Sequence, residues 1–214
     1  MGIPILILFA AVPVLAGDTP LMRAAAGGRL EEVRSLLAGG AEVNATSEDG
    51  ETALLLAARS GRREVIEALL AAGANPAARR WNGETALHAA AASGVAEAVE
   101  LLAARLDDKD PRESRRGQTP LHYASGAGSV EALRALLRAG AEVNARSTGG
   151  ATALWFAAQG GHVEAVEALL AAGAEPETAG PGGKRPVQFA VRAGRPALLE
   201  PFVPARVNLN HPDG

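Results

Sequence analysis

The chain of 214 residues contains no cysteine, and phenylalanine, tyrosine and tryptophan together make up only 3% of it. The lack of cysteine excludes disulfide bonds, thiol catalysis and cysteine-ligated zinc sites. Because aromatic rings are scarce, the core must be assembled from small and aliphatic side chains in close contact. Apolar residues still account for 48% of the chain, and alanine dominates among them. This composition is typical of short helices that stack closely.

The chain also lacks a basic excess and the motifs of catalysis. Its formal net charge is -3, which argues against a nucleic-acid partner, because phosphate binding needs a clustered basic face. No two of the four histidines have the spacing of metal ligands on a helix, and no Gly-x-Ser-x-Gly elbow occurs. Residues 180–185 are rich in glycine but lack the spacing of a phosphate-binding loop. We therefore predict no catalytic residue, no cofactor and no metal site.

The apolar run at residues 3–15 is shorter than the roughly 20 residues that a membrane-spanning helix needs. It has the length of a signal-peptide core, and Val14 and Ala16 are the small residues that favour cleavage after Ala16. No lysine or arginine precedes the run. We predict that residues 1–16 are a cleaved leader, that the mature chain has no stable membrane span and that it is exported to the periplasm or secreted. In the alternative interpretation, the run is an uncleaved arm of a cytoplasmic protein.

A repeat fills the rest of the chain. A Gly-x-Thr pattern places threonine at 19, 52, 85, 119 and 152, in steps of about 33 residues. An alanine pair, a glycine, a leucine pair and a Gly-Ala step follow in most copies. The threonine suits a helix N-cap, the glycine suits a turn, and the spacing of the apolar residues predicts a second helix. One such unit cannot bury its apolar face, whereas six stacked units can.

The segment Thr119-Pro120-Leu121-His122, together with this period, resembles the ankyrin repeat over residues 17–210. The resemblance implies an all-α repeat solenoid of about six stacked units, each with two antiparallel helices and a projecting β-hairpin loop. It also implies that His88 and His122 form structural hydrogen bonds rather than take part in catalysis. The predicted repeats lie near residues 17–47, 48–80, 81–113, 114–146, 147–179 and 180–210.

Two departures from the pattern carry predictions. Between the third and fourth repeats, Leu106-Asp107 replaces the Gly-Ala step and is followed by residues 108–111 and one extra residue, which predicts an irregular loop. In the sixth repeat, Pro201 and Pro204 should shorten the second helix, so this degenerate copy is interpreted as a terminal cap. Residues 207–214 resemble the start of a further repeat. This pattern favours the interpretation that the given sequence is a fragment of a longer chain.

In ankyrin-like proteins, the hairpin tips and the concave face of the first helices bind partners. The resemblance therefore implies a non-catalytic scaffold, expected to be monomeric, that binds another protein of unknown identity. The candidate tip positions are Glu48, Asp49, Glu51, Trp81, Asn82, Glu84, Arg115, Arg116, Gln118 and Lys184, and the candidate first-helix positions are Arg59, Gln159 and Arg192.

One helix position gathers the scarce aromatic residues. The residue two after the motif leucine is Tyr123, Phe156 and Phe189 in the last three repeats. We expect this position to point away from the stacked core, where aromatic rings serve as interface anchors. In the alternative, these rings fill space between neighbouring repeats. Trp81 is a clearer anchor because a hairpin tip offers little to pack against, whereas Trp155 replaces the motif histidine and is predicted to be packed.

The tips are acidic near the second repeat and basic near the fourth, so we hypothesise a partner with the complementary order of charge. Two other readings of the function stay open. The chain could be an intracellular adaptor or effector, or it could be a small-molecule-binding or enzymatic accessory protein that uses the concave groove. A shallow groove disfavours small-molecule binding, since such ligands usually occupy deep pockets.

Overall fold

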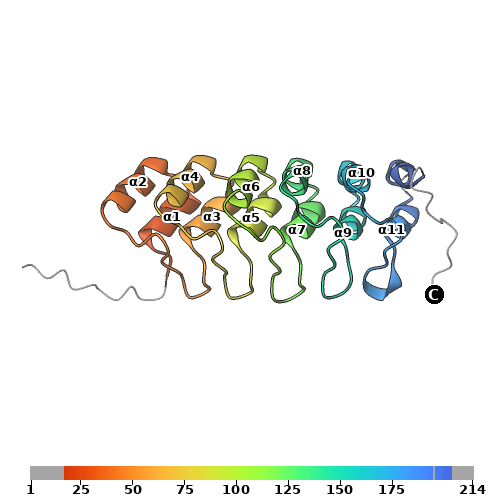
Figure 1. Ribbon diagram of the computed structural model, residues 1–214, viewed down its shortest axis with the longest axis horizontal. Helices are drawn as coiled ribbons and strands as arrows, with labels where there is room; N and C mark the ends of the chain where they lie inside the picture. The colour runs from red at the N-terminus through yellow and green to blue at the C-terminus, as the bar shows by residue number, and fades with distance from the viewer. Residues whose placement is uncertain (1–16, 195, 204–214) are drawn as a thin grey trace, which may run out of the picture.

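The computed structural model describes residues 17–194 and 196–203 as an elongated stack of helix pairs (Figure 1). The first helix of each pair forms one layer, and the second helix forms another. The first layer contains α1 (Pro20–Ala26), α3 (Ala53–Arg59), α5 (Ala86–Ser93), α7 (Pro120–Ala127), α9 (Ala153–Gly160) and α11 (Pro186–Ala193). The second layer contains α2 (Leu30–Ala38), α4 (Arg63–Ala71), α6 (Ala96–Ala103), α8 (Val130–Arg138), α10 (Val163–Ala171) and α12 (Pro196–Leu199).

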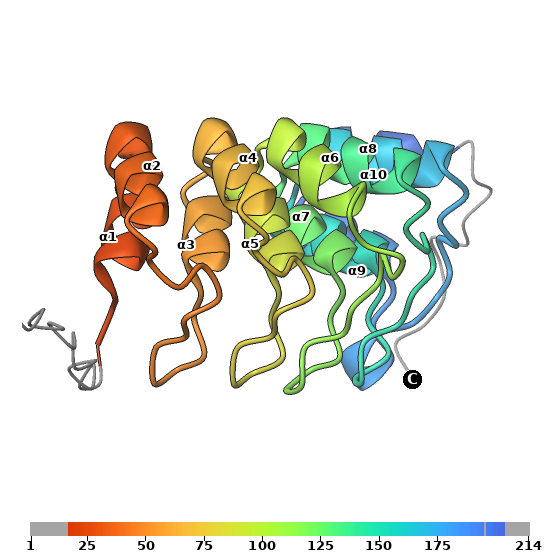
Figure 2. The same ribbon diagram turned by 60° about the vertical axis from the view of Figure 1, so that its left-hand side comes forward.

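The connections between pairs project from one side of the stack as long loops, which Figure 2 shows in a row. Each loop closes by turn hydrogen bonds, such as Ser47 N to Glu51 O at 3.0 Å. Neighbouring tips are joined by single main-chain bonds, including Trp81 N to Asp49 O at 3.1 Å and Thr148 N to Arg116 O at 2.7 Å. The expected hairpins therefore exist as turns and bridging bonds, and no strand occurs within the described residues.

The core lies between the layers and between successive pairs, as the alanine-rich composition predicts. The alanine pairs Ala57-Ala58, Ala90-Ala91 and Ala157-Ala158 are at most 1% exposed. The motif leucines, such as Leu54 and Leu87, are equally buried. Because alanine has a small side chain, the first helices of neighbouring pairs pack in direct contact along the whole layer.

The threonines begin the first helices as predicted. Thr52 and Thr152 accept hydrogen bonds from the backbone N–H three residues on, which satisfies a donor that the helix leaves free. A glycine with positive φ ends several of these helices, as at Gly94, where φ is 81°. A Cβ at Gly94 would also lie 2.9 Å from Ser129 Oγ, so the backbone conformation favours glycine and a larger residue would displace the Ser129 side chain.

Buried donors join each of three first helices to the hairpin that follows it. Nε2 of His88 lies 3.1 Å from Gln118 O, and Nε2 of His122 lies 3.0 Å from Ala151 O. Nδ1 of His122 accepts the N–H of its own N-cap, Thr119, at 3.0 Å. Trp155 takes the same place in the fifth repeat by donating its indole N–H to the following hairpin. The structural role implied for these histidines is therefore confirmed, and so is the packed position of Trp155.

The connection after α6 is irregular, as predicted, but the extra residue lies further along the chain. Asp110 occupies the position of Asn44 and Asn144, so the register holds up to this point. The main chain then closes from Gly117 N to Glu113 O, one residue longer than the bond from Gly50 N to Ser47 O. The insertion therefore enlarges the tip of the fourth hairpin.

Asp110 is poorly matched to its position. At the equivalent Asn44, the side-chain oxygen accepts Asn75 N at 2.8 Å and the amide donates to Gly73 O at 3.1 Å. Asp110 keeps the first bond, to Glu142 N at 2.9 Å, but its other oxygen is buried without a partner. Burial raises the pKa of Asp110, because the ionised carboxylate loses hydration.

The sixth pair is shortened as predicted. Its second helix has a single α-helical turn, α12, followed by the 3₁₀ turn Glu200–Phe202 that contains Pro201. Phe202 is fully buried and closes the end of the core. The predictions for residues 1–16, for Pro204 and for residues 207–214 concern segments outside the described residues.

We predict that Asp110→Asn stabilises the protein by about 1 kcal/mol at pH 7, because an amide supplies the donor that the carboxylate lacks. A raised folded-state pKa lowers stability above that pKa, so the advantage should shrink as the pH falls and Asp110 takes up a proton. Urea unfolding at pH 7 and at acidic pH measures both effects. Asp107→Asn, an exposed change of equal charge, is the control. Equal effects of the two variants would contradict the assignment.

The structure also predicts an acid sensitivity centred on His122. Burial lowers the pKa of His122 from 6.5 to about 4, so its contribution to stability is complete above pH 6.5 and is lost as the pH falls toward 4. The loss should reach up to about 3 kcal/mol. His122→Gln should make the pH dependence of urea unfolding shallower, since Gln188 already fills this position in the sixth repeat and accepts Arg185 N at 2.7 Å. An unchanged slope would show that His122 is not responsible.

Candidate partner-binding surface

The predicted surface residues gather in hollows where the first helices meet the hairpins. The Tyr123 hollow has a volume of about 430 Å³, and it contains Glu51, Arg59, Glu84 and Tyr123 from the predicted set. The Phe156 hollow, also of about 430 Å³, contains Arg115, Arg116, Gln118, Phe156 and Gln159. The Phe189 hollow, of about 460 Å³, contains Gln159, Lys184 and Arg192.

The remaining four predicted residues lie outside these hollows. Glu48 and Asp49 are exposed on the second hairpin, close to Glu51 in the sequence. Asn82 shapes the third hairpin by accepting Glu84 N at 3.1 Å through its side chain. Trp81 is 64% exposed at the tip of that hairpin, as predicted. It therefore offers a large apolar surface to solvent or to a partner.

The aromatic residues two positions after the motif leucine both pack between repeats and remain partly exposed. Each ring packs edge to face on the histidine or tryptophan of the preceding repeat: Tyr123 lies 5.1 Å from His88, and Phe156 lies 5.5 Å from His122. Phe189 contacts Trp155 in the same way at 5.0 Å. The rings thus fill space between repeats, and their half-exposed edges line the hollows.

Charges in the Tyr123 hollow neutralise one another. Arg59 pairs with Glu51 at 2.6 Å, and Arg80 pairs with Glu84 at 3.1 Å and lies 3.6 Å from Glu51. The two arginines are thus matched by two carboxylates. Arg80 was not among the predicted residues, although it lies four residues before Glu84 in the sequence.

Tyr123 completes this network by donating its hydroxyl to Glu84 Oε1 at 2.5 Å. Burial and the adjacent carboxylate raise the pKa of Tyr123 well above its ordinary value of 10. Burial alone would raise the pKa of Glu84, but hydrogen bonds from Tyr123, Asn82 and Arg80 outweigh it, and the pKa is lowered. Tyr123 is therefore held by this hydrogen bond while its ring stays half-exposed in the hollow.

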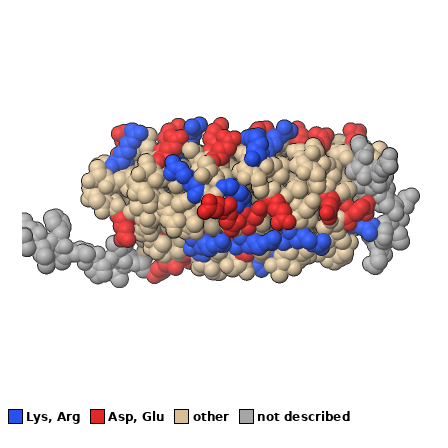
Figure 3. Space-filling view, viewed as in Figure 1, with Lys and Arg blue, Asp and Glu red and all other residues tan. Residues whose placement is uncertain are grey.

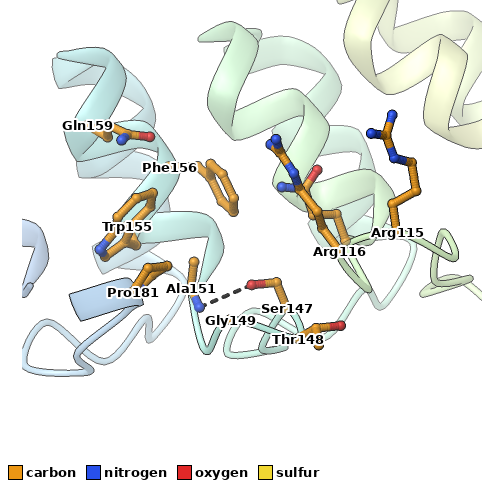
Figure 4. A pocket seen from close by; sticks show the side chains of 11 residues that line it. Arg115, Arg116, Ser147, Thr148, Gly149, Ala151, Trp155, Phe156, Gln159 and Pro181 are labelled. Atoms are coloured by element: carbon orange, nitrogen blue, oxygen red, sulfur yellow. Dashed lines mark hydrogen bonds between the residues drawn. The ribbon is translucent and has the colours of Figure 1, made fainter. Parts of the chain in front are cut away.

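The Phe156 hollow differs because its charge is unmatched. Figure 4 shows Phe156 between Trp155 on one side and Arg116 on the other. The lining residues include two arginines and no carboxylate. Neither Arg115 nor Arg116 forms an ion pair with any described residue.

Glu113 holds the fourth hairpin tip in place. Glu113 is 4% exposed, and its carboxylate accepts the backbone N–H groups of Arg115 at 2.7 Å, Arg116 at 2.6 Å and Gln118 at 3.1 Å. These bonds fix the main chain of the enlarged tip while leaving the arginine side chains exposed. The sequence did not identify Glu113, since its role depends on the conformation of the tip.

Figure 3 shows a row of basic side chains across the hairpins, below a row of acidic ones. Exposed arginines at matching positions of successive repeats are linked in line by hydrogen bonds. Arg79 donates to Arg112 O at 3.0 Å, Arg112 to Arg146 O at 2.5 Å, and Arg146 to Ala179 O at 3.1 Å. Because these guanidinium groups bind main-chain carbonyls of the next repeat, we interpret them as ties between repeats.

Comparison with known proteins agrees with this geometry. A family model described as ankyrin repeats (3 copies) matches residues 6–80 and 77–147, and an ankyrin repeat model matches residues 149–180. The chain belongs to the ankyrin-repeat family. Ankyrin repeats are generally protein–protein interaction modules, and the family is typically non-catalytic. No curated protein matches the chain.

Among solved structures, the crystal structure of the human ASB11 ankyrin repeat domain is similar to this chain. The TM-score is 0.84 at 27% sequence identity, and the match covers 92% of this chain and 88% of the other. In all, 576 chains match, so the likeness alone identifies no partner. Within the described residues, no helix has the length and apolarity of a membrane span, and no group of side chains is arranged to hold a metal ion.

Tyr123 is the only tyrosine in the chain, so its ionisation can be followed by tyrosinate absorbance. We predict that the folded protein shows no tyrosinate near pH 10, because the pKa of Tyr123 is raised. Glu84→Gln should lower that pKa without returning it to the ordinary value, since burial is the larger cause. Titration of the unfolded protein in urea provides the reference. Ionisation near pH 10 in the folded wild type would contradict the Tyr123–Glu84 contact.

Proposed function

We propose that this ankyrin-repeat chain is a non-catalytic scaffold that binds another protein through its hairpin tips and the hollows of its first-helix face. The observation that carries the proposal is the Phe156 hollow, which combines a half-exposed aromatic ring with two unpaired arginines. Aromatic residues and arginine are the usual anchors of protein interfaces. Within the described residues, the guanidinium groups of Arg115 and Arg116 form no ion pair that would explain their exposure.

The three hollows differ in what they can contribute. The Tyr123 hollow is neutralised internally, so a partner gains little electrostatic attraction there. The Phe156 hollow offers positive charge beside an apolar wall, and Trp81 lies exposed on the neighbouring hairpin. The binding centre therefore falls on the third to fifth hairpins, and the acidic second hairpin sets the orientation of the partner.

Reversing the charge of the fourth tip tests this function. A partner would be captured from the native host by photo-crosslinking through a probe at position 148, purified, and measured by surface plasmon resonance. Arg115→Glu/Arg116→Glu should slow association by about tenfold at low salt, and the difference should diminish as salt screens the charges. The control, Arg105→Glu/Arg134→Glu, makes the same change in net charge at exposed positions outside the three hollows. If both variants associate at the same rate, this binding face is wrong.

A further inference from the structure

The Phe156 hollow is formed by three successive repeats. Arg115, Arg116 and Gln118 come from the fourth hairpin, Phe156 and Gln159 from α9, and Pro181 from the sixth hairpin. Its apolar wall consists of Ala151, Trp155, Phe156 and Pro181, and its rim is polar. A volume of about 430 Å³ is enough to receive one large side chain.

The wall of this hollow is held in place before any partner arrives. Trp155 donates its indole N–H to Lys184 O at 3.0 Å, and its ring packs between Phe156 at 5.2 Å and Phe189 at 5.0 Å. Trp155 is only 6% exposed, so it cannot turn into the hollow and fill it without breaking these contacts. A preformed wall lowers the ordering cost of binding.

The charge at the rim restricts what can bind. The carboxylate nearest in sequence, Glu113, is buried and takes three main-chain donors, so it does not bind the guanidinium groups of Arg115 and Arg116. Both side chains keep their full donor capacity for an anion, and arginine binds carboxylates in a bidentate manner. In the Tyr123 hollow, by contrast, Arg59 and Arg80 are each paired with a glutamate.

A long polyanion fits this face poorly. The chain has a net charge of -3, and the second hairpin carries Glu48 and Asp49 on its exposed side. A nucleic acid crossing the hairpins would meet these carboxylates after leaving the fourth tip. A short acidic peptide avoids them and also uses the apolar wall, which a phosphate chain would leave exposed.

We propose that the Phe156 hollow binds a short acidic segment of a partner protein, which inserts one large apolar side chain against Phe156 and Trp155 and pairs its carboxylates with Arg115 and Arg116. This inference rests on the proposed function and specifies the chemistry of the partner at that site.

Selection from a random 12-residue peptide library displayed on phage tests the inference with the full chain as the target. Enriched peptides should carry aspartate or glutamate within a few residues of a large apolar residue. Their affinity, measured by fluorescence anisotropy, should fall about tenfold or more for Arg115→Glu/Arg116→Glu and separately for Phe156→Ala. Affinity for Arg105→Glu/Arg134→Glu should stay within about twofold of wild type, and added salt should weaken binding.

The other outcomes are equally decisive. Enriched peptides that are basic or neutral, or a library that yields no binder, would overturn the acidic-segment inference. Peptides that bind through the Tyr123 hollow, identified by their sensitivity to Glu51→Gln, would overturn it while leaving the proposed function intact. Peptides that are insensitive to every change on the first-helix face would contradict both proposals. Circular dichroism of each variant confirms that the helices remain folded.

Discussion

In this chain, the apolar faces of each helix pair are shielded from water only by the neighbouring pairs. The alanine pairs allow the first helices to approach closely, and the leucines of both layers fill the space between them. Polar ties then fix the register: His88 and His122 reach the following hairpin from inside, and arginines link the hairpins from outside. Because stability comes from contacts between neighbours, the exposed positions of each repeat are free to vary in chemistry.

That freedom is used differently along the stack. At the third hairpin, Arg80 pairs with Glu84, and Glu84 also accepts the hydroxyl of Tyr123 from α7, so the charges there are matched. At the fourth hairpin, Glu113 binds main-chain N–H groups instead, and Arg115 and Arg116 beside it form no ion pair with any described residue. The same backbone thus presents a neutral hollow next to a positive one, and the difference arises from where a few carboxylates point.

Much of this architecture could be predicted from the sequence because the period repeats local rules. The N-cap threonines, the buried alanine pairs, the packed Trp155 and the exposed Trp81 all followed from position within the unit. Features that depend on contacts across repeats did not. The hydrogen bond from Tyr123 to Glu84 could not be predicted, because the two residues lie 39 positions apart in the sequence. The roles of Arg80 and Glu113 need the folded hairpins, which spacing alone does not describe.

The buried side-chain ties also give the stack a direction. His88, His122 and Trp155 each donate forward to a carbonyl of the next hairpin. Removal of the sixth repeat would therefore leave the indole N–H of Trp155 without its acceptor, whereas the first two repeats have Met22 and Leu55 at this position and their removal breaks no such bond. A duplicated unit would bring its own donor and acceptor, so this chain can lengthen by whole repeats more easily than it can lose its last ones.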